Sequence, residues 1–137
     1  MIGPRDRTAA DIGPAVPPDR QLVQGYGPGR FRIAGEIYES SILLFPDRVL
    51  PWPVADIAAV TADTLGPVFE AEPRVELILL GCGARMAPVP SSLRVALKDA
   101  GIVVEPMDTG AACRTYNVLM AEDRRVAAAL IALPPLL

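Results

Sequence analysis

The fold is decided by two stretches of similar form, VELILLGCG at residues 75–83 and IVVEPMDTG at residues 102–110. Each begins with a mostly apolar run of strand length and ends in small or polar residues that can turn the chain. The first run indicates a buried strand, and the second indicates the next strand along the chain. The segments that follow them have helical periodicity, so the second half of the chain predicts alternating strands and helices.

A helix is expected between these two strands. Pro90 suits the first turn of a helix, because an N–H group at that position would have no partner within the helix. Apolar residues then recur at helical spacing from Leu93 to Ala100, which places them on one face. Gly101 follows at the position where helices commonly end in a left-handed glycine, so the helix is expected to stop there.

A second helix and a third strand are expected to complete this half. Asp108 is expected to cap the helix, which ends near Ala121. Residues 126–131 are rich in alanine, so helix propensity alone would extend the helix through them. The polar break at 122–125 favours a strand instead, and a third strand completes a second right-handed crossover.

The first half of the chain favours short antiparallel strands that form a meander. The segments with strand patterns are 31–33, 36–38, 42–45 and 48–50. Residues 25–29, GYGPG, are expected to form a loop because they are too rich in glycine for regular structure. Trp52 lies between two prolines, so the meander should end there. Its indole ring either covers the core or anchors a partner.

Two elements are expected to connect the antiparallel half to the alternating half. Residues 57–60, IAAV, predict a further short strand. Thr61 is expected to cap a helix that runs to about Ala71, with Gly66 and Pro67 interrupting its middle.

The length of 137 residues fits one domain, and a composition that is 51% hydrophobic and 21% charged allows a buried core. Residues 1–20 are rich in proline and lack an apolar period, so a disordered arm is expected before a single domain at 21–137. Neither a membrane span nor a signal peptide is indicated. A net charge of −3 without a dense run of Lys and Arg disfavours nucleic acid as a partner.

Histidine is absent, which removes the base of Ser-His-Asp and Cys-His catalysis and the commonest metal ligand. Cys82 and Cys113 are too few for a disulfide scaffold or a four-ligand zinc site. A reducing cytoplasm is therefore the expected compartment. No catalytic residue, metal site or cofactor is assigned.

The residues that could carry chemistry gather where two predicted strands end. In open α/β sheets, ligands bind beyond the carboxyl ends of the strands. Glycines there allow close backbone approach, and a helix that starts at Thr109 offers N–H groups and a positive dipole to an anion. The candidate residues are Gly81, Cys82, Gly83, Arg85, Asp108, Thr109, Arg114 and Asn117. They predict a small-anion site, with the alternative that the loop and the helix cap only shape the fold.

Two pairs of residues leave further alternatives open. Arg114 and Asn117 share a helix face, so they could orient a ligand or bind the 81–83 loop. The alternative is that Arg114 pairs with Asp108 or caps loop carbonyls. Cys113 lies near a helix start, where the pKa of a thiol can be lowered, and a redox role with Cys82 is a third hypothesis. Against it, free cysteine commonly serves as a small buried apolar residue.

Three segments carry a resemblance to a known family: GYG at 25–27 followed by FRIAG at 31–35, LLGCG at 79–83, and MDTGAACRTYN at 107–117. Together with Tyr38, the strand at 41–46 and Trp52, they resemble the Mth-domain family of unknown function over about residues 22–133. That family includes the mitochondrial complex I assembly factor three and the adipogenesis-associated Mth-domain protein.

The resemblance implies a three-layer α/β fold, in which a β-meander packs on a small mixed sheet flanked by helices, with a strand at 126–131. It also implies a non-enzymatic interaction protein that helps assemble a respiratory, complex I-like membrane complex. Such a protein would work from the cytoplasmic side and reach the inner membrane through its protein partner. Cys82 stands where many relatives are expected to have threonine or another small residue, which argues against an essential thiol. The alternative is a small-anion or metabolite-binding protein, or a modest enzyme, at the strand-end crevice. A homodimer stays open.

Overall fold

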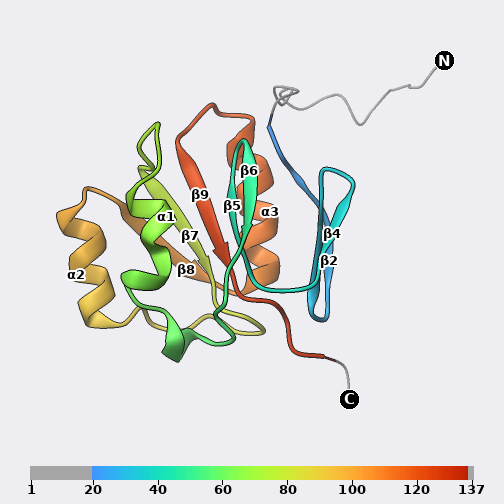
Figure 1. The fold of residues 1–137 in the computed structure, drawn as a ribbon, viewed down its shortest axis with the longest axis horizontal. Helices are drawn as coiled ribbons and strands as arrows, with labels where there is room; N and C mark the ends of the chain where they lie inside the picture. Colours follow the sequence, from blue (N-terminus) through green and yellow to red (C-terminus); the bar gives the residue numbers. More distant parts are fainter. Residues whose placement is uncertain (1–19, 136–137) are drawn as a thin grey trace.

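The computed structural model describes residues 20–135, so the arm expected at 1–20 lies, except for Arg20, outside the described residues. An antiparallel half is followed by an alternating half (Figure 1). The strands and helices are β2 (Val23–Gly27), β3 (Arg30–Ile33), β4 (Glu36–Tyr38), β5 (Ile42–Phe45), β6 (Arg48–Pro51), α1 (Gly66–Phe69), β7 (Leu77–Gly81), α2 (Ser91–Asp99), β8 (Val103–Met107), α3 (Thr109–Met120) and β9 (Val126–Leu130). Two short 3-10 turns, η2 (Ile57–Ala59) and η3 (Asp63–Leu65), precede α1.

The strands form two sheets. A mixed sheet has the order β6-β5-β9-β7-β8, in which β9, β7 and β8 are parallel and β5 is antiparallel to both of its neighbours. A small antiparallel sheet has the order β2-β3-β4. Proline lies in both outer strands of the mixed sheet, Pro51 in β6 and Pro106 in β8. Because proline has no N–H group to donate, it limits the addition of a further strand at either edge.

Both faces of the mixed sheet are apolar, and each has its own core. Ile78 and Leu80 of β7 pack toward α1 and α2, whereas Leu77 and Leu79 pack toward α3 and the small sheet. The same alternation in β5 and β9 divides their buried side chains between the two cores. Figure 1 shows the resulting layers, with α1 and α2 on one side of the sheet and α3 and the small sheet on the other. This architecture confirms the predicted three-layer α/β class.

The alternating half was predicted correctly from its periodicity. Helix α2 buries Leu93 and Leu97 and ends before Gly101, whose φ of +76° is the left-handed conformation expected there. Pro90 is the residue before the first helical residue. Asp108 caps α3, with its carboxylate accepting a hydrogen bond from the Ala111 N–H at 2.8 Å. The alanine-rich stretch after α3 forms β9, as the polar break indicated.

The prediction of a loop at 25–29 is wrong for its first part, since residues up to Gly27 belong to β2. Backbone pairing with β3 stabilises this strand. Gly25 and Gly27 are tolerated because β2 is an outer strand, in which these two positions do not have to supply side chains to a core. The single predicted meander is also divided. Strands β2, β3 and β4 form it, whereas the β5–β6 hairpin joins the mixed sheet beside β9, because the side chains of β5 are buried on both faces.

The connection between the two halves also differs from prediction. Residues 57–60 form the turn η2 instead of a strand. Gly66 and Pro67 begin α1 instead of interrupting a longer helix, because proline suits a first turn. Trp52 is 2% exposed, and its indole N–H donates to the carbonyl oxygen of Thr64 at 2.8 Å. The indole therefore covers the core rather than offering a surface anchor.

The small sheet is attached to α3 through the side chain of Asn117. Its Oδ1 accepts a hydrogen bond from the N–H of Val23 at 2.9 Å, and its Nδ2 donates to the carbonyl oxygen of Val23 at 2.8 Å. The amide thus pairs with the outer strand β2 much as a neighbouring strand would. Asn117 has a structural role in the fold, whichever ligand or partner the protein takes.

Replacing Asn117 with alanine should loosen this attachment. Two hydrogen bonds to a half-buried backbone are lost, so the free energy of unfolding should fall by about 1–3 kcal/mol. Urea unfolding followed by circular dichroism measures the change. Val118→Ala is the matched control on the same helix, because Val118 is 64% exposed and its loss should cost little. Equal stability of the two variants would contradict the role given to Asn117.

Candidate functional site

The predicted strand-end crevice is closed by the hydroxyl group of Thr109. Thr109 is the first residue of α3 and is fully buried. Its Oγ1 accepts a hydrogen bond from the N–H of Gly83 at 2.8 Å and donates to the carbonyl oxygen of Ile131 at 2.7 Å. Its own N–H donates to the carbonyl oxygen of Gly83 at 2.8 Å. The start of α3 is therefore joined to the chain that follows β7 and to the chain that follows β9.

The glycines around this crevice accommodate the protein's own residues. A Cβ atom on Gly81 would lie 3.0 Å from Oγ1 and 3.1 Å from Cα of Thr109. Gly83 has a φ of +97°, which disfavours any residue with a side chain. A Cβ atom on Gly110 would lie 2.7 Å from the hydroxyl oxygen of Tyr26. Close packing accounts for Gly81 and Gly110, and backbone conformation accounts for Gly83, without a ligand.

The N–H groups of Thr109, Ala111 and Ala112, at the start of α3, find partners inside the fold. The N–H of Ala111 donates to the Asp108 carboxylate, and the N–H of Ala112 donates to the Asp108 carbonyl oxygen at 3.0 Å. With the bond from Thr109 to Gly83, three N–H groups that could bind an anion are already engaged. The structure brings Gly81, Cys82, Gly83, Asp108 and Thr109 together as predicted, and their hydrogen bonds support the alternative that they shape the fold.

Among the described residues, no hydrogen bond or ion pair joins the two arginines expected beside the crevice to the crevice residues. Nη1 of Arg114 donates to the hydroxyl oxygen of Tyr26 at 2.7 Å, and no ion pair with Asp108 forms among the described residues. The expected pairing with Asp108 is therefore wrong. Arg85 is exposed in the loop that follows β7. Both guanidinium groups are presented to the surface.

The two cysteines are free thiols in different surroundings. Cys82 is half-buried, with Sγ 3.5 Å from the carbonyl oxygen of Leu80. Cys113 is 2% exposed, and burial raises the pKa of its thiol to about 12, with Asp108 adding to the rise and Arg114 opposing it. The expectation of a lowered pKa is wrong, because burial raises the pKa of this thiol by more than the nearby helix N-terminus lowers it. Cys113 stays protonated at neutral pH and packs as an apolar residue.

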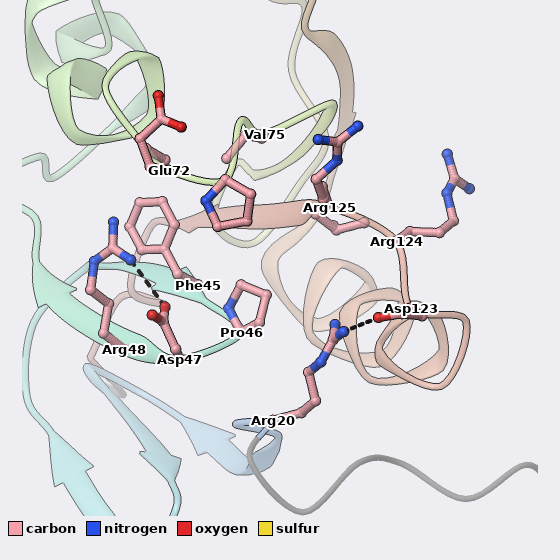
Figure 2. Close-up of a pocket in the computed structure, with 13 residues that line it drawn as sticks. Arg20, Phe45, Pro46, Asp47, Arg48, Glu72, Val75, Asp123, Arg124 and Arg125 are labelled. Atoms are coloured by element: carbon pink, nitrogen blue, oxygen red, sulfur yellow. Dashed lines mark hydrogen bonds and ion pairs between the residues drawn. The ribbon is translucent and has the colours of Figure 1, made fainter.

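A pocket of about 490 Å³ lies at the opposite end of the mixed sheet, where β7 and β9 begin (Figure 2). Its walls come from four separate segments of the chain, at 20, 45–48, 71–75 and 123–126. Its arginines are Arg20, Arg48, Arg124 and Arg125. The sequence pattern did not predict this pocket, since the only local signal for it is the adjacent pair of arginines between α3 and β9.

Carboxylates neutralise most of the positive charge in this pocket. Figure 2 shows Arg20 paired with Asp123, and Arg48 paired with Asp47 at 3.0 Å. The guanidinium of Arg48 also lies 4.1 Å from the centre of the Phe45 ring. Arg125 pairs with Glu76, which lies just outside the lining residues. The pocket is thus a junction of ion-paired loops, without a concentration of unpaired positive charge that would hold an anion.

Residues 20–135 contain no helix long and apolar enough to cross a membrane. The longest of the helices described is α3, with 12 residues. Within the same residues, no three His, Cys, Asp or Glu side chains lie close enough together to hold a metal ion.

Comparison with known proteins connects this fold to a family and to named relatives. The model of a family described as "protein of unknown function (DUF498/DUF598)" matches residues 23–131. An uncharacterised protein of Rhodobacter capsulatus is 41% identical over 112 residues, which cover 82% of this chain and 85% of that protein. The NADH dehydrogenase [ubiquinone] 1 alpha subcomplex assembly factor 3 of Danio rerio is 35% identical over 83% of this chain, and that of Homo sapiens is 34% identical over 82%. These matches span 64% and 60% of the two assembly factors.

Solved structures share the fold. A Bordetella pertussis protein described as a Mth938-like domain is 32% identical, with a TM-score of 0.74 over 85% of this chain and 89% of that one. A Bartonella henselae protein, described as an outer membrane protein, is 37% identical, with a TM-score of 0.78 over 85% of this chain and 98% of that one. Both likenesses extend over nearly all of the described residues.

Removing the Thr109 hydroxyl should show that the crevice is a structural joint. In Thr109→Val, the buried N–H of Gly83 and C=O of Ile131 both lose their partner, so the free energy of unfolding should fall by about 2–3 kcal/mol. Chemical unfolding measures it. Thr115→Val, at a half-buried position of the same helix, controls for helix propensity. A Thr109→Val protein as stable as the Thr115→Val protein would contradict the assignment.

Proposed function

The chain belongs to the DUF498/DUF598 family of proteins of unknown function, and from this membership we propose that it is a non-enzymatic protein that binds other proteins during assembly of a respiratory, complex I-like NADH dehydrogenase. The observation that supports this most is the identity of about a third to the assembly factors across more than four-fifths of the chain. Because the chain spans less than two thirds of those proteins, their partners are proposed for it and not transferred.

The chemistry of the strand-end crevice supports an interaction role over catalysis. The N–H groups of Gly83, Thr109 and Ala111 and the hydroxyl of Thr109 are hydrogen-bonded within the fold, and so are not free to bind a reacting ligand. Of the candidate residues, Arg85 and Arg114 have exposed side chains that can contact a partner. Gly81, Gly83 and Thr109 hold the loop and helix that carry these arginines.

The place of action that fits this proposal is the cytoplasmic side of the inner membrane. The protein would be held there by the complex that it helps to assemble. Attachment would therefore depend on the presence of the partner subunits. Washing membranes that lack them should leave none of the protein bound.

Deleting the gene should lower the amount of assembled NADH dehydrogenase in the membrane at least twofold, because unassembled subunits are degraded when a required factor is missing. Native gel electrophoresis with an in-gel NADH oxidation stain measures the assembled complex. Expression of the full chain from a plasmid should restore it. A tagged full chain, purified after gentle solubilisation, should enrich subunits or assembly factors of the same complex.

Arg114→Ala tests the candidate surface in this experiment, because it removes an exposed guanidinium and keeps the hydroxyl of Tyr26. The rescue should be weaker with Arg114→Ala than with an exposed substitution on α2, such as Arg94→Ala. Normal levels of assembled complex in the deletion strain, together with no enriched subunit, would reject the proposed function.

A further inference from the structure

The small sheet has one face that the rest of the described chain leaves uncovered. The register places Gly25 opposite Arg32 and Gly27 opposite Arg30, so these four residues share one face. Arg32 also lies opposite Ile37 of β4, which extends the same face. In Figure 1 the small sheet is the outermost layer on its side of the molecule. We call the surface made by Gly25, Gly27, Arg30, Arg32 and Ile37 the glycine face.

The opposite face of the small sheet belongs to the core. Phe31 and Ile33 alternate with the two arginines of β3 and are 1% and 0% exposed. Tyr26, which lies opposite Phe31, reaches Gly110 and Arg114 of α3. The glycine face is therefore the solvent side of a sheet whose inner side is well packed.

The two glycines of this face lack the internal reasons that account for Gly81, Gly83 and Gly110. Neither Gly25 nor Gly27 has a positive φ, and a Cβ atom on either would meet nothing within 4 Å. A register irregularity between Val23 and Gly25 gives Gly25 a local explanation, but Gly27 pairs in regular register. Glycine weakens a strand in which it is not needed. A bare backbone at such a position is typical of a site that another chain approaches closely.

The charge of the glycine face defines the partner that fits it. Arg30 and Arg32 are exposed, and among residues 20–135 neither forms an ion pair. Ile37 is 53% exposed beside them. A second copy of this face would bring arginines against arginines, which disfavours a symmetric dimer through it. Carboxylates near an apolar side chain are complementary to it.

We propose that the glycine face is the docking surface for an acidic segment of a protein partner. The main chain of the segment lies against Gly25 and Gly27, its carboxylates pair with Arg30 and Arg32, and an apolar side chain covers Ile37. This inference rests on the proposed function, since it requires a protein partner. It assigns a surface, and a chemical class of partner, to that interaction.

Gly27→Val in the full chain separates folding from docking. Valine favours strands and has open space here, so the melting temperature should be unchanged or rise by up to about 4 °C. The added side chain blocks backbone approach, so recovery of the partner by the tagged protein should fall at least tenfold. Gly66→Ala is the matched control, because Gly66 also has open space but lies at the start of α1.

A charge-reversal pair tests the class of partner. Arg30→Glu/Arg32→Glu should also lower recovery at least tenfold, whereas Arg94→Glu/Lys98→Glu, at exposed positions of α2, should change it less than twofold. A photo-reactive benzoylphenylalanine in place of Ile37 should become cross-linked to a partner peptide that contains Asp or Glu, identified by mass spectrometry.

The outcomes separate this inference from the proposed function. If the wild-type chain recovers a partner and Gly27→Val recovers it within twofold, the docking surface is wrong and the proposed function stands. A cross-link to a second copy of this chain, to its residues 1–19 or to lipid likewise overturns the acidic-partner assignment. If the wild-type chain enriches no partner and its deletion leaves the complex intact, both the proposed function and the docking surface fail.

Discussion

The position of the other layers depends on the hydrogen bonds of one buried hydroxyl group, that of Thr109. Thr109 bonds the loop after β7 to the chain after β9, and it does so from the first residue of α3. This joint fixes α3 against one face of the mixed sheet. The small sheet is in turn attached to α3 through Asn117 and through the contact of Tyr26 with Gly110 and Arg114. The glycine face is thus presented by a layer whose position depends on Thr109.

Five glycines of the described residues fall into two groups with different causes. Gly81 and Gly110 are required because another residue of the protein occupies the place of a side chain, and Gly83 is required by its backbone conformation. Gly25 and Gly27 have open space and ordinary backbone conformations. The first group explains how the fold closes at the strand ends. The proposed docking surface is built on the second group, on the outer surface of the small sheet rather than in the crevice.

Sequence periodicity correctly predicted the helices and strands whose own residues carry a clear apolar spacing and end signals. Strand β7, helix α2 and helix α3 could be placed because apolar spacing and end signals such as Asp108 and Gly101 agree. Strand β2 could not, because pairing with β3 stabilises it against its own glycine content. The division of the expected meander into two sheets was also unpredictable, since the neighbour of β5 in the mixed sheet is β9, far along the chain.

The sequence predicted that the strand-end residues lie together, but it did not predict their contacts. Residues 81–83 and Asp108 meet Thr109 because parallel strands end at one edge, which is a general rule. The partner of Arg114 is Tyr26, 88 positions away, and the arginines of the pocket at the opposite end of the sheet come from three separate segments. Such contacts depend on how the layers pack, which local pattern does not specify.

Amide hydrogen exchange at the strand ends tests the central claim, that the crevice is a structural joint and not a ligand site. The N–H groups of Gly83, Thr109 and Ile131 can be followed by NMR with and without inorganic phosphate. The account predicts that they are among the slowest to exchange, because they open only with global unfolding, and that phosphate changes none of them. Fast exchange at these amides, or saturable slowing by phosphate, would contradict it.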